Sequence, residues 1–348
     1  MLELDAQLAA RGFDVTLQVT TGETLAVLGP NGSGKSTLLE TIAGLTRPDA
    51  GHARLDDRVL FDLDSRTGGD WLPPHRRTVS LLAQSALLFP RMSVSANVAF
   101  GPRSAGVGKT AANERARHWL AEVDASELGA RKPAQLSGGQ AQRAAIARAL
   151  ASDPRLLLLD EPMAALDVTV TPALRRLLRR VLADQTTILV THDVLDAYTL
   201  ANRVAVMSKG RIVEIGNTRD VFEHPHSPFT AALVGSNLVV GIRTARGLTT
   251  DTGMEFLAES PDIASGSRVG ATLSPTAIHL SASRPAGARL NAGRATVSDL
   301  EPRGALVRVS LGGLVADIAP ALVADLDLVP GSDVWFSFPG AELRVYEI

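Results

Sequence analysis

The chain has no cysteine among its 348 residues. This absence excludes disulfide bonds and thiolate metal sites, and it is compatible with a cytoplasmic protein. Charge of one sign is not in excess either, since 35 Lys and Arg residues stand against 37 Asp and Glu residues, a net charge of -2. A protein that wraps a polyanion such as DNA carries a basic footprint, so we expect no nucleic-acid partner.

Long hydrophobic runs are also absent. The longest, such as LLLL at 156–159 and LVV at 238–240, fall far short of the roughly 20 residues that span a bilayer. The N-terminal segment has Glu3 and Asp5 where a secretory signal would carry basic residues followed by an apolar run. We therefore expect a protein that is not exported and that reaches a membrane only peripherally, through partners.

The residues that are present fall into two regions of different pattern. Hydrophobic residues make up 45% and charged residues 21% of the chain, and its length allows two domains. From 1 to 235, short strand-like runs alternate with helical patterns, which predicts an α/β sheet domain. From 238 to 348, small β-type runs are separated by Gly, Pro and Ser, with almost no helical periodicity. This second region predicts a small all-β C-terminal domain.

One strand, loop and helix pattern fits the phosphate-binding loop G-x-x-x-x-G-K-[ST]. It reads GPNGSGKS at 29–36 and follows the apolar run LAVL. The glycines let backbone N–H groups approach phosphates, Lys35 reaches the β- and γ-phosphates, and the Ser36 hydroxyl binds Mg²⁺. The alternative is a glycine-rich turn before a helix. The predicted nucleotide contacts are Gly29, Pro30, Asn31, Gly32, Ser33, Gly34, Lys35, Ser36 and Thr37.

Further strand-like runs end in polar residues. LLLLDEP places Asp160 and Glu161 at the C-terminal end of a buried parallel strand, where Asp160 would hold Mg²⁺ and Glu161 would polarise the attacking water. His192 ends another run, TTILVTH, and is placed to sense the γ-phosphate. Gln84 follows VSLLA, where it can reach both metal and water. Singly, each is typical of a solvated strand end; beside a phosphate loop they predict catalytic residues, with Ser36, Gln84 and Asp160 as metal ligands.

A second anion-binding pattern lies about a hundred residues after the phosphate loop. The segment LSGGQAQR at 136–143 places the hydroxyl of Ser137 and two glycines in front of a helical run. This arrangement is typical of a helix N-terminus with open backbone N–H groups, which can hold an anion. The chain thus carries two phosphate cradles, and one nucleotide does not explain the second.

The order and spacing of these motifs resemble those of the ATP-binding cassette (ABC) ATPases. GPNGSGKS, Gln84, LSGGQ, LLLLDEP, ALD and THD follow that family's order over essentially all of 1–235. The resemblance implies a P-loop nucleotide-binding domain that binds ATP and Mg²⁺, with a mixed sheet and antiparallel β and helical subdomains. It also implies two cassettes packed head to tail, the LSGGQ of one closing on the ATP of the other. A homodimer is expected because the chain has one cassette.

The resemblance assigns roles to residues outside the phosphate loop. Asp167 carries over from the segment AALD at 164–167, whereas Ala164 stands where serine is usual and supplies no hydroxyl. Phe13 is the best placed candidate for the aromatic that stacks on adenine, and the alternative is a core residue of an edge strand. The residues expected to meet the γ-phosphate across the dimer interface are Ser137, Gly138, Gly139 and Gln140.

Other features favour a transport branch of the family. The spacing between Lys35 and Leu136 leaves no room for the long coiled coil of the repair and chromosome ATPases, and the single cassette differs from the two-cassette translation-linked members. Phe89, Pro90 and Met92 lie where importers form an apolar groove for the coupling helix of a membrane subunit. The alternative is a loop buried in the helical subdomain.

The C-terminal region resembles the small oxyanion-binding barrel (OB/Mop/TOBE-like) of importer ATPases, especially those for molybdate. We therefore expect an ATPase on the cytoplasmic face of the cell membrane that energises uptake of molybdate or tungstate. Its expected partners are two membrane-spanning permease subunits and an extracellular or periplasmic substrate-binding protein. Sulfate or thiosulfate, iron, polyamine and sugar importers are alternatives, and a cytosolic oxyanion sensor or store is the alternative of another class. Pro339 and Gly340 stand where such barrels commonly have a basic residue, which leaves oxyanion binding, regulation and dimerisation open for this domain.

Overall fold

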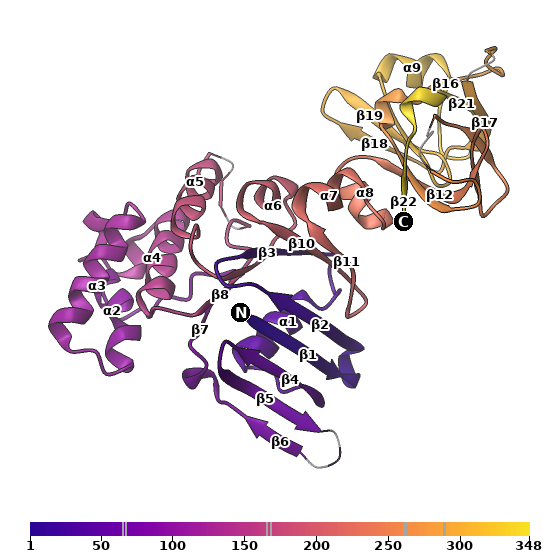
Figure 1. The fold of residues 1–348 in the computed structure, drawn as a ribbon. Helices are drawn as coiled ribbons and strands as arrows, with labels where there is room; N and C mark the ends of the chain where they lie inside the picture. The colour runs from indigo at the N-terminus through magenta and orange to yellow at the C-terminus, as the bar shows by residue number, and fades with distance from the viewer. Residues whose placement is uncertain (65, 67, 165, 168, 260–262, 288–289) are drawn as a thin grey trace. The chain divides into compact units, whose positions relative to one another are not determined.

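Figure 1 shows the fold as a computed structural model, in which all residues are described except 65, 67, 165, 168, 260–262 and 288–289. The described residues form two compact units, Met1–Thr218 and Arg219–Ile348. Within the described part of the chain, no helix combines the length and the apolar character needed to cross a lipid bilayer.

The first unit is organised around a mixed sheet. Its strands are β3 (Thr24–Leu28), β7 (Val79–Leu82), β8 (Leu156–Asp160), β9 (Thr187–Val190), β10 (Arg203–Ser208) and β11 (Arg211–Asn217). In the sheet they lie in the order β11-β10-β3-β9-β8-β7. All adjacent pairs are parallel except β10 and β11, which are antiparallel. Because the parallel strands point the same way, the loops after β3, β8 and β9 meet at one edge of the sheet, where ligands bind in open α/β sheets.

An antiparallel sheet forms a second layer of this unit. It contains β1 (Leu2–Leu8), β2 (Phe13–Val19), β4 (Ala50–Leu55), β5 (Arg58–Asp64) and β6 (Gly68–Trp71), in the order β2-β1-β4-β5-β6. The strict alternation of buried and exposed residues along β2 shows that one face is on the core and the other is solvated. The core between the two sheets encloses helix α1 (Lys35–Ala43).

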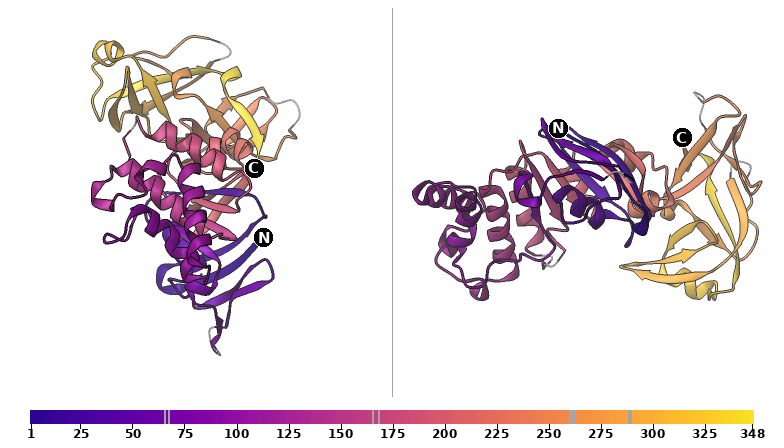
Figure 2. Two further views of the ribbon diagram at one scale, coloured as in Figure 1. Left: turned by 90° about the vertical axis from the view of Figure 1, so that its left-hand side faces the viewer. Right: turned by 90° about the horizontal axis from the view of Figure 1, so that it is seen from below.

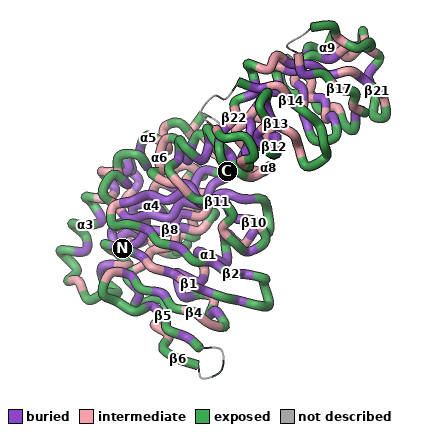
Figure 3. Tube along the Cα trace, turned by 45° about the vertical axis from the view of Figure 1, so that its right-hand side comes forward, coloured by how far each residue is buried: buried purple, intermediate pink, exposed green. Residues whose placement is uncertain are grey.

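Helices cover the opposite face of the mixed sheet. They are α2 (Val94–Ser104), α3 (Lys109–Glu122), α4 (Gly138–Ala151), α5 (Thr171–Val181) and α6 (Val194–Leu200). The four leucines of β8 explain why both faces are occupied: Leu156 and Leu158 lie in the core around α1, whereas Leu157 and Leu159 lie in the core with α2–α5. A strand covered on both faces reads as an uninterrupted apolar run. Figure 2 gives two further views of the ribbon, and the tube in Figure 3, coloured by burial, shows that β8 is largely buried.

A buried cation joins α1 to the segment that follows β6. Arg77 is fully buried, and its guanidinium donates to the carbonyl oxygens of Thr41 (2.8 Å), Ile42 (2.9 Å) and Leu72 (2.8 Å). It also stacks on the Trp71 ring, at 4.1 Å from the ring centroid. Burial lowers the pKa of Arg77 to about 10, so the side chain is still protonated at neutral pH. Arg77 thus caps the C-terminal end of the helix that begins at the phosphate loop.

The second unit is built mainly from antiparallel strands, as the sequence predicts. Its strands are β12 (Asn237–Thr244), β13 (Gly247–Thr250), β14 (Glu255–Leu257), β15 (Arg268–Leu273), β16 (His279–Ser281), β17 (Leu290–Thr296), β18 (Asp299–Arg303), β19 (Leu306–Ser310), β20 (Val315–Ile318), β21 (Asp333–Pro339) and β22 (Arg344–Glu347). They form the sheets β14-β13-β12-β15-β22, β16-β21-β17 and β18-β19-β20 around one core. Three short helices, α7 (Thr218–Glu223), α8 (Pro228–Leu233) and α9 (Pro320–Asp325), complete the described α-helices.

The second unit also includes the helical segment between Arg219 and the start of β12. The segment from Arg219 onward packs on its own β strands, because the Tyr346 hydroxyl of β22 donates to the Pro225 carbonyl at 2.6 Å and the Tyr346 ring lies 5.0 Å from His224. Helix α8 also contacts β12. These contacts join a helical segment to strands far along the chain.

Candidate functional site

The loop between β3 and α1 has a backbone conformation that glycine adopts readily. Gly29 has φ 152° and Gly34 has φ 104°, in the region that L side chains rarely enter. A Cβ atom on Gly29 would lie 2.3 Å from the backbone oxygen of Met207 in β10, so the loop packs directly on this strand. Helix α1 begins immediately after the loop, at Lys35. The amide groups of its first turn have no acceptor within the helix and are open to an anion.

Lys35 lies across the loop. Its ammonium group donates to the carbonyl oxygens of Gly29 (2.7 Å) and Pro30 (3.0 Å), and the residue is 8% exposed. Burial lowers the pKa of Lys35, while the negative charges of Glu161 and Asp160 oppose this shift. A phosphate oxygen is a stronger acceptor than these two neutral carbonyl groups because it is charged. A bound phosphate could therefore replace these two carbonyl groups as the acceptor of the Lys35 hydrogen bonds.

The loop opens onto a cavity of about 370 Å³. The hydroxyl of Ser33 in this loop is buried and has no hydrogen-bond partner among the described residues. Gly29 and Pro30 are not among the described residues that line this cavity. Their carbonyl oxygens accept hydrogen bonds from Lys35. An ammonium group beside an open helix N-terminus fits the phosphate chain of a nucleotide. The described lining residues are Arg11, Asn31, Gly32, Ser33, Gly34, Lys35, Ser36, Thr37, Asp160, Glu161 and Val190.

Two carboxylates stand at the end of β8, on the wall of the same cavity. The chain turns sharply after Asp160, since Glu161 has φ 45° and its N–H donates to the Val190 carbonyl at 2.9 Å. Positive φ in a non-glycine residue is strained, and such strain concentrates at functional sites. Burial raises the pKa of Asp160, with a further contribution from the charge of Glu161, whereas Lys35 lowers it.

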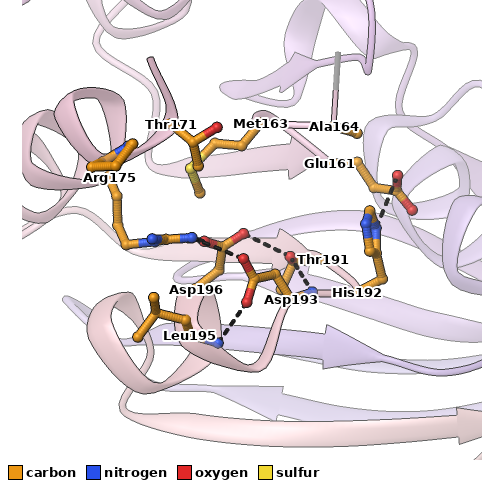
Figure 4. Close-up of a pocket in the computed structure, with 11 residues that line it drawn as sticks. Glu161, Met163, Ala164, Thr171, Arg175, Thr191, His192, Asp193, Leu195 and Asp196 are labelled. Atoms are coloured by element: carbon orange, nitrogen blue, oxygen red, sulfur yellow. Dashed lines mark hydrogen bonds and ion pairs between the residues drawn. The ribbon is translucent and has the colours of Figure 1, made fainter. Parts of the chain in front are cut away.

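His192 lies next to Glu161 (Figure 4). The distance from His192 Nδ1 to Glu161 Oε2 is 3.4 Å, and the side chains are 67% and 22% exposed, respectively. The structure thus brings together the two residues that the sequence predicts from two separate strand ends. Behind this pair lies a cavity of about 310 Å³, lined by Glu161, Met163, Ala164, Thr171, Pro172, Arg175, Thr191, His192, Asp193, Leu195 and Asp196.

Gln84 is not brought to the cavity around the phosphate loop. It is exposed, two residues beyond the end of β7, and it is not among the described residues that line either cavity of the site. Ser36 and Asp160, the other two predicted metal ligands, line the same cavity. The structure therefore assembles two of the three predicted ligands.

The segment LSGGQ forms the start of α4. Ser137 is the N-cap: its hydroxyl accepts from the Gln140 N–H at 3.4 Å, and the Gln140 side chain accepts from the Ser137 N–H at 3.1 Å. Ser137 and Gly138 are exposed. Gly139 packs against Val170, the residue before helix α5, because a Cβ atom on Gly139 would lie 2.9 Å from Val170 Cγ1. Among the described residues, none of this segment lines the phosphate-loop cavity, so the two cradles are separate within one chain.

The AALD segment leads from β8 into α5. Asp167 is exposed, and its carbonyl accepts from the Val170 N–H at 2.9 Å and from the Thr171 N–H at 3.1 Å. Ala164 is exposed and lines the cavity behind His192. Ala165 of this segment lies outside the described residues. Asp167 therefore has an exposed side chain and a backbone that starts the next helix.

The expectation that Phe13 stacks on adenine is not supported by its position. Phe13 is 2% exposed and belongs to the core between the two sheets. A Cβ atom on Gly34 would lie 3.4 Å from the Phe13 ring, so the ring packs beneath the loop. Stacking needs an exposed aromatic face. Phe13 starts the alternating pattern of β2, and the structure places it as the core residue that the sequence left as the alternative.

Two arginines at the site are not indicated by any sequence motif. Arg11 lines the phosphate-loop cavity and pairs with Glu40 at 3.0 Å. Arg175 pairs with Asp193 and Asp196 beside His192. These contacts join residues far apart in the chain, and neither arginine stands in a local motif that predicts its partner.

Comparison with known proteins agrees with this geometry. Residues 13–164 match the family model described as "ABC transporter". The chain is 44% identical to the "Molybdenum import ATP-binding protein ModC" of Mycobacterium tuberculosis, over 99% of this chain and 97% of that protein. It is 38% identical to the "Spermidine/putrescine import ATP-binding protein PotA" of Acidothermus cellulolyticus, over 79% of this chain and 72% of that protein.

A solved structure shows the same cassette fold. It is described as a dimeric structure of a post-hydrolysis state of the ATP-binding cassette MJ0796 bound to ADP and Pi. It matches with a TM-score of 0.54 and 28% identity, over 63% of this chain and 99% of that chain. With the full-length match to ModC, these similarities show that the chain belongs to the ABC transporter family, as an ATP-binding protein of the ModC-like branch.

Proposed function

We propose that this protein is the ATP-hydrolysing subunit of an ABC importer that energises the uptake of molybdate. The observation that carries the proposal is the 44% identity to ModC over 99% of the chain, which includes the second unit. An iron-import relative from Rhodococcus jostii, FbpC 3, is 45% identical but over only 67% of the chain. Similarity of the cassette is therefore shared among importers, and the second unit favours molybdate over iron and polyamines.

In this proposal Glu161 is the general base of hydrolysis. It accepts a proton from the attacking water as the water oxygen bonds to the γ-phosphorus and the bond from phosphorus to the β,γ-bridging oxygen breaks, which releases ADP and phosphate. Glu161 lines the cavity that also contains Lys35. His192, 3.4 Å away, orients this carboxylate and contacts the γ-phosphate. Lys35, Ser33 and the first turn of α1 bind the phosphates.

The site fits Mg²⁺ in part. A hydroxyl and a carboxylate are oxygen donors that Mg²⁺ prefers, and Ser36 and Asp160 line one cavity. We propose that these two residues hold the ion and that Gln84 joins them after its exposed loop moves. When bound, Mg²⁺ neutralises charge on the β- and γ-phosphates.

A second copy of the chain would complete the site. The N-terminus of α4 is formed by Ser137, Gly138, Gly139 and Gln140, of which Ser137 and Gly138 are exposed. None of the four is among the described residues that line the phosphate-loop cavity of the same chain. We propose that this helix N-terminus and Asp167 close on the ATP of a partner copy, in a symmetric homodimer. The dimeric state described for the cassette MJ0796 supports this arrangement.

An exposed apolar surface on the helical side is proposed to bind the permease subunits. Leu87, Phe89 and Phe100 are 68%, 37% and 43% exposed, and the rings of Phe89 and Phe100 lie 4.6 Å apart. Pro90 is exposed and Met92 is half-buried beside them. The buried Asn97 side chain bonds to the backbone of Phe89 through its carbonyl oxygen and its amide. Docking of one permease subunit on this surface of each copy would hold the homodimer on the cytoplasmic face of the membrane.

The two domains would divide these tasks. We propose that residues 1–235 form the ATPase domain and that 238–348 form an OB/Mop/TOBE-like regulatory domain. The antiparallel strands and single core of the second unit support this assignment. Pro339 closes β21 and Gly340 follows it, so no basic side chain stands at that place to hold an oxyanion. Oxyanion binding by this domain would need other residues.

Lys35→Ala is expected to weaken ATP binding by at least tenfold. The change removes the buried ammonium group that faces the phosphates, and a charge-assisted hydrogen bond contributes about 1.5–3 kcal/mol, or roughly ten- to a hundredfold in affinity. Titration with a fluorescent ATP analogue measures the effect. Lys109→Ala, at the exposed start of α3, is the matched control. Unchanged affinity in Lys35→Ala would contradict the assignment of the phosphate loop.

Uptake of labelled molybdate and labelled sulfate tests the transport function. In cells that depend on this protein, Lys35→Ala should abolish molybdate uptake and leave sulfate uptake unchanged. Loss of sulfate uptake alone would keep the ATPase and change the substrate. Loss of neither would reject both oxyanions, and uptake of iron and polyamines would then be measured.

A further inference from the structure

An ion-pair network connects helix α5 to the loop that carries His192 (Figure 4). The Arg175 side chain is 13% exposed; its Nε donates to Asp196 Oδ1 at 2.7 Å and its Nη2 to Asp193 Oδ2 at 2.9 Å. Asp193 is the N-cap of α6, and Asp196 lies in the first turn. One guanidinium therefore ties two points of the α6 N-terminus to α5.

The network continues to both neighbours of His192. Thr191 Oγ1 donates to Asp196 Oδ2 at 2.9 Å and accepts from the Asp193 N–H at 3.1 Å. Asp193 Oδ1 also accepts from the Leu195 N–H at 2.8 Å. The residues directly before and after His192 are thus held by one connected set of hydrogen bonds, and Arg175 is its only cation among the described residues.

The His192 ring depends on this backbone for its position. The ring is 67% exposed and its described contact is with Glu161, at 3.4 Å. This single contact of an exposed ring is too weak to fix the orientation of the His192 side chain. The backbone from Thr191 to Asp193 therefore decides whether the imidazole faces Glu161 or turns away.

Removing the guanidinium would disturb the loop. Asp196 is buried, and burial raises the pKa of its carboxyl group, while hydrogen bonds from Arg175 and Thr191 oppose the shift. Asp193 adds a second negative charge beside it. Without Arg175, two carboxylates would face each other with no cation between them. A buried carboxylate without a partner is costly, so the N-terminus of α6 would rearrange.

We propose that Arg175 is a positioning residue for ATP hydrolysis. Its hydrogen bonds tie the segment 191–196 to helix α5, and the segment in turn places the His192 ring next to Glu161. This inference rests on the proposed function, in which Glu161 is the base and His192 orients it. Arg175 does not line the phosphate-loop cavity. It therefore acts on the rate of hydrolysis and leaves ATP binding unchanged.

Arg175→Met in the full-length protein tests the proposal. A displacement of reacting groups by about 1 Å, caused by a mutation away from the chemistry, can lower a rate by about 100-fold. We therefore expect kcat to fall by about 10–100-fold while the affinity for ATP changes less than about twofold. Arg176→Met, on the exposed face of the same helix, is the control and should keep the wild-type kcat. Arg175→Lys should recover part of the rate, because one ammonium group can hold one carboxylate but not both in the same geometry. A wild-type kcat in Arg175→Met, or an equal loss of ATP affinity, would overturn the proposal.

A double-mutant cycle with His192→Ala shows whether Arg175 acts through the histidine. We expect Arg175→Met to lower kcat by less than about twofold once His192 is absent. The full loss in the His192→Ala background would show that Arg175 acts by another route. If His192→Ala alone keeps the wild-type rate, the proposed role of His192 is wrong, and the inference is rejected with it. If only His192→Ala lowers the rate, the inference fails and the proposed function stands.

If the Arg175→Met variant does not fold, the double variant Arg175→Met, Asp196→Asn provides the test. The double change removes the buried carboxylate together with its cation, which preserves stability better than removal of one partner. We expect a melting temperature close to that of the wild type and the same loss of kcat. Wild-type kcat in this folded variant would contradict the proposal.

Discussion

Glu161→Gln is expected to stop ATP hydrolysis while ATP binding persists. The amide cannot accept the proton of the attacking water, and loss of a general base lowers the rate by about 10²–10⁴-fold. Glutamine keeps the size of the side chain, so the cavity and the turn at φ 45° are retained. The change also removes a negative charge from the cavity wall, where ATP brings further negative charge. Binding should therefore be unchanged or tighter.

The variant should also trap the proposed homodimer. With hydrolysis blocked, ATP stays between the phosphate loop of one copy and the Ser137 segment of the other. Light scattering at saturating ATP should show a dimer for Glu161→Gln, and a monomer without nucleotide. Glu127→Gln, an exposed acid in another part of the unit, is the control and should hydrolyse ATP at the wild-type rate. A monomeric Glu161→Gln protein with bound ATP would show that the site is not shared.

Arg77→Met should be the most destabilising of the substitutions considered. It removes the Arg77 donor from the carbonyl oxygens of Ile42, Leu72 and Thr41, of which, among the described residues, only the Thr41 oxygen keeps another N–H, that of Gly44 at 3.2 Å. It also removes the cation from the Trp71 ring. Two carbonyl groups left without a donor cost about 1–3 kcal/mol each and the lost contact with the ring about 1 kcal/mol, so the loss is on the order of 3–5 kcal/mol. For a unit of this size that corresponds to a melting temperature lower by about 10 °C.

Calorimetry of the full-length protein measures this loss. Arg76→Met, one residue earlier and exposed, is the matched control and should unfold within about a degree of the wild type. Arg77→Lys should lie between the two, because an ammonium group cannot donate to all three carbonyl groups in the planar arrangement of a guanidinium. A melting temperature of Arg77→Met equal to the control would show that the hydrogen bonds of Arg77 contribute little.

Local patterns predict the parts of the site that are local in structure. The phosphate loop, the turn after Asp160 and the start of α4 at Ser137 each depend on neighbours within a few residues, such as glycines with positive φ and a capping hydroxyl. Parallel strands then bring Glu161 and His192 to one sheet edge, as their positions at strand ends indicate. These features depend on backbone geometry, which sequence pattern reflects well.

Contacts between distant residues were not predictable in the same way. Arg77, Asn97 and Arg175 find their partners through the packing of whole helices and loops, and an arginine or asparagine alone does not indicate what it will contact. Phe13 shows the opposite error. The family resemblance favoured a surface role, whereas the alternating pattern of β2 already placed it on the buried face. In that case the local pattern was the better guide to the structure.

The strand order of the mixed sheet sets a constraint on biosynthesis. β3, which enters the phosphate loop, lies between β9 and β10, so Leu25 pairs with Ile188 on one side and Arg203 on the other. A ribosome must add about 180 residues after β3 before both neighbours exist. At about 5–20 residues per second this takes roughly 10–40 s. Until then the apolar β3 lacks at least one of its two partner strands, and an unpaired apolar strand favours aggregation of the nascent chain.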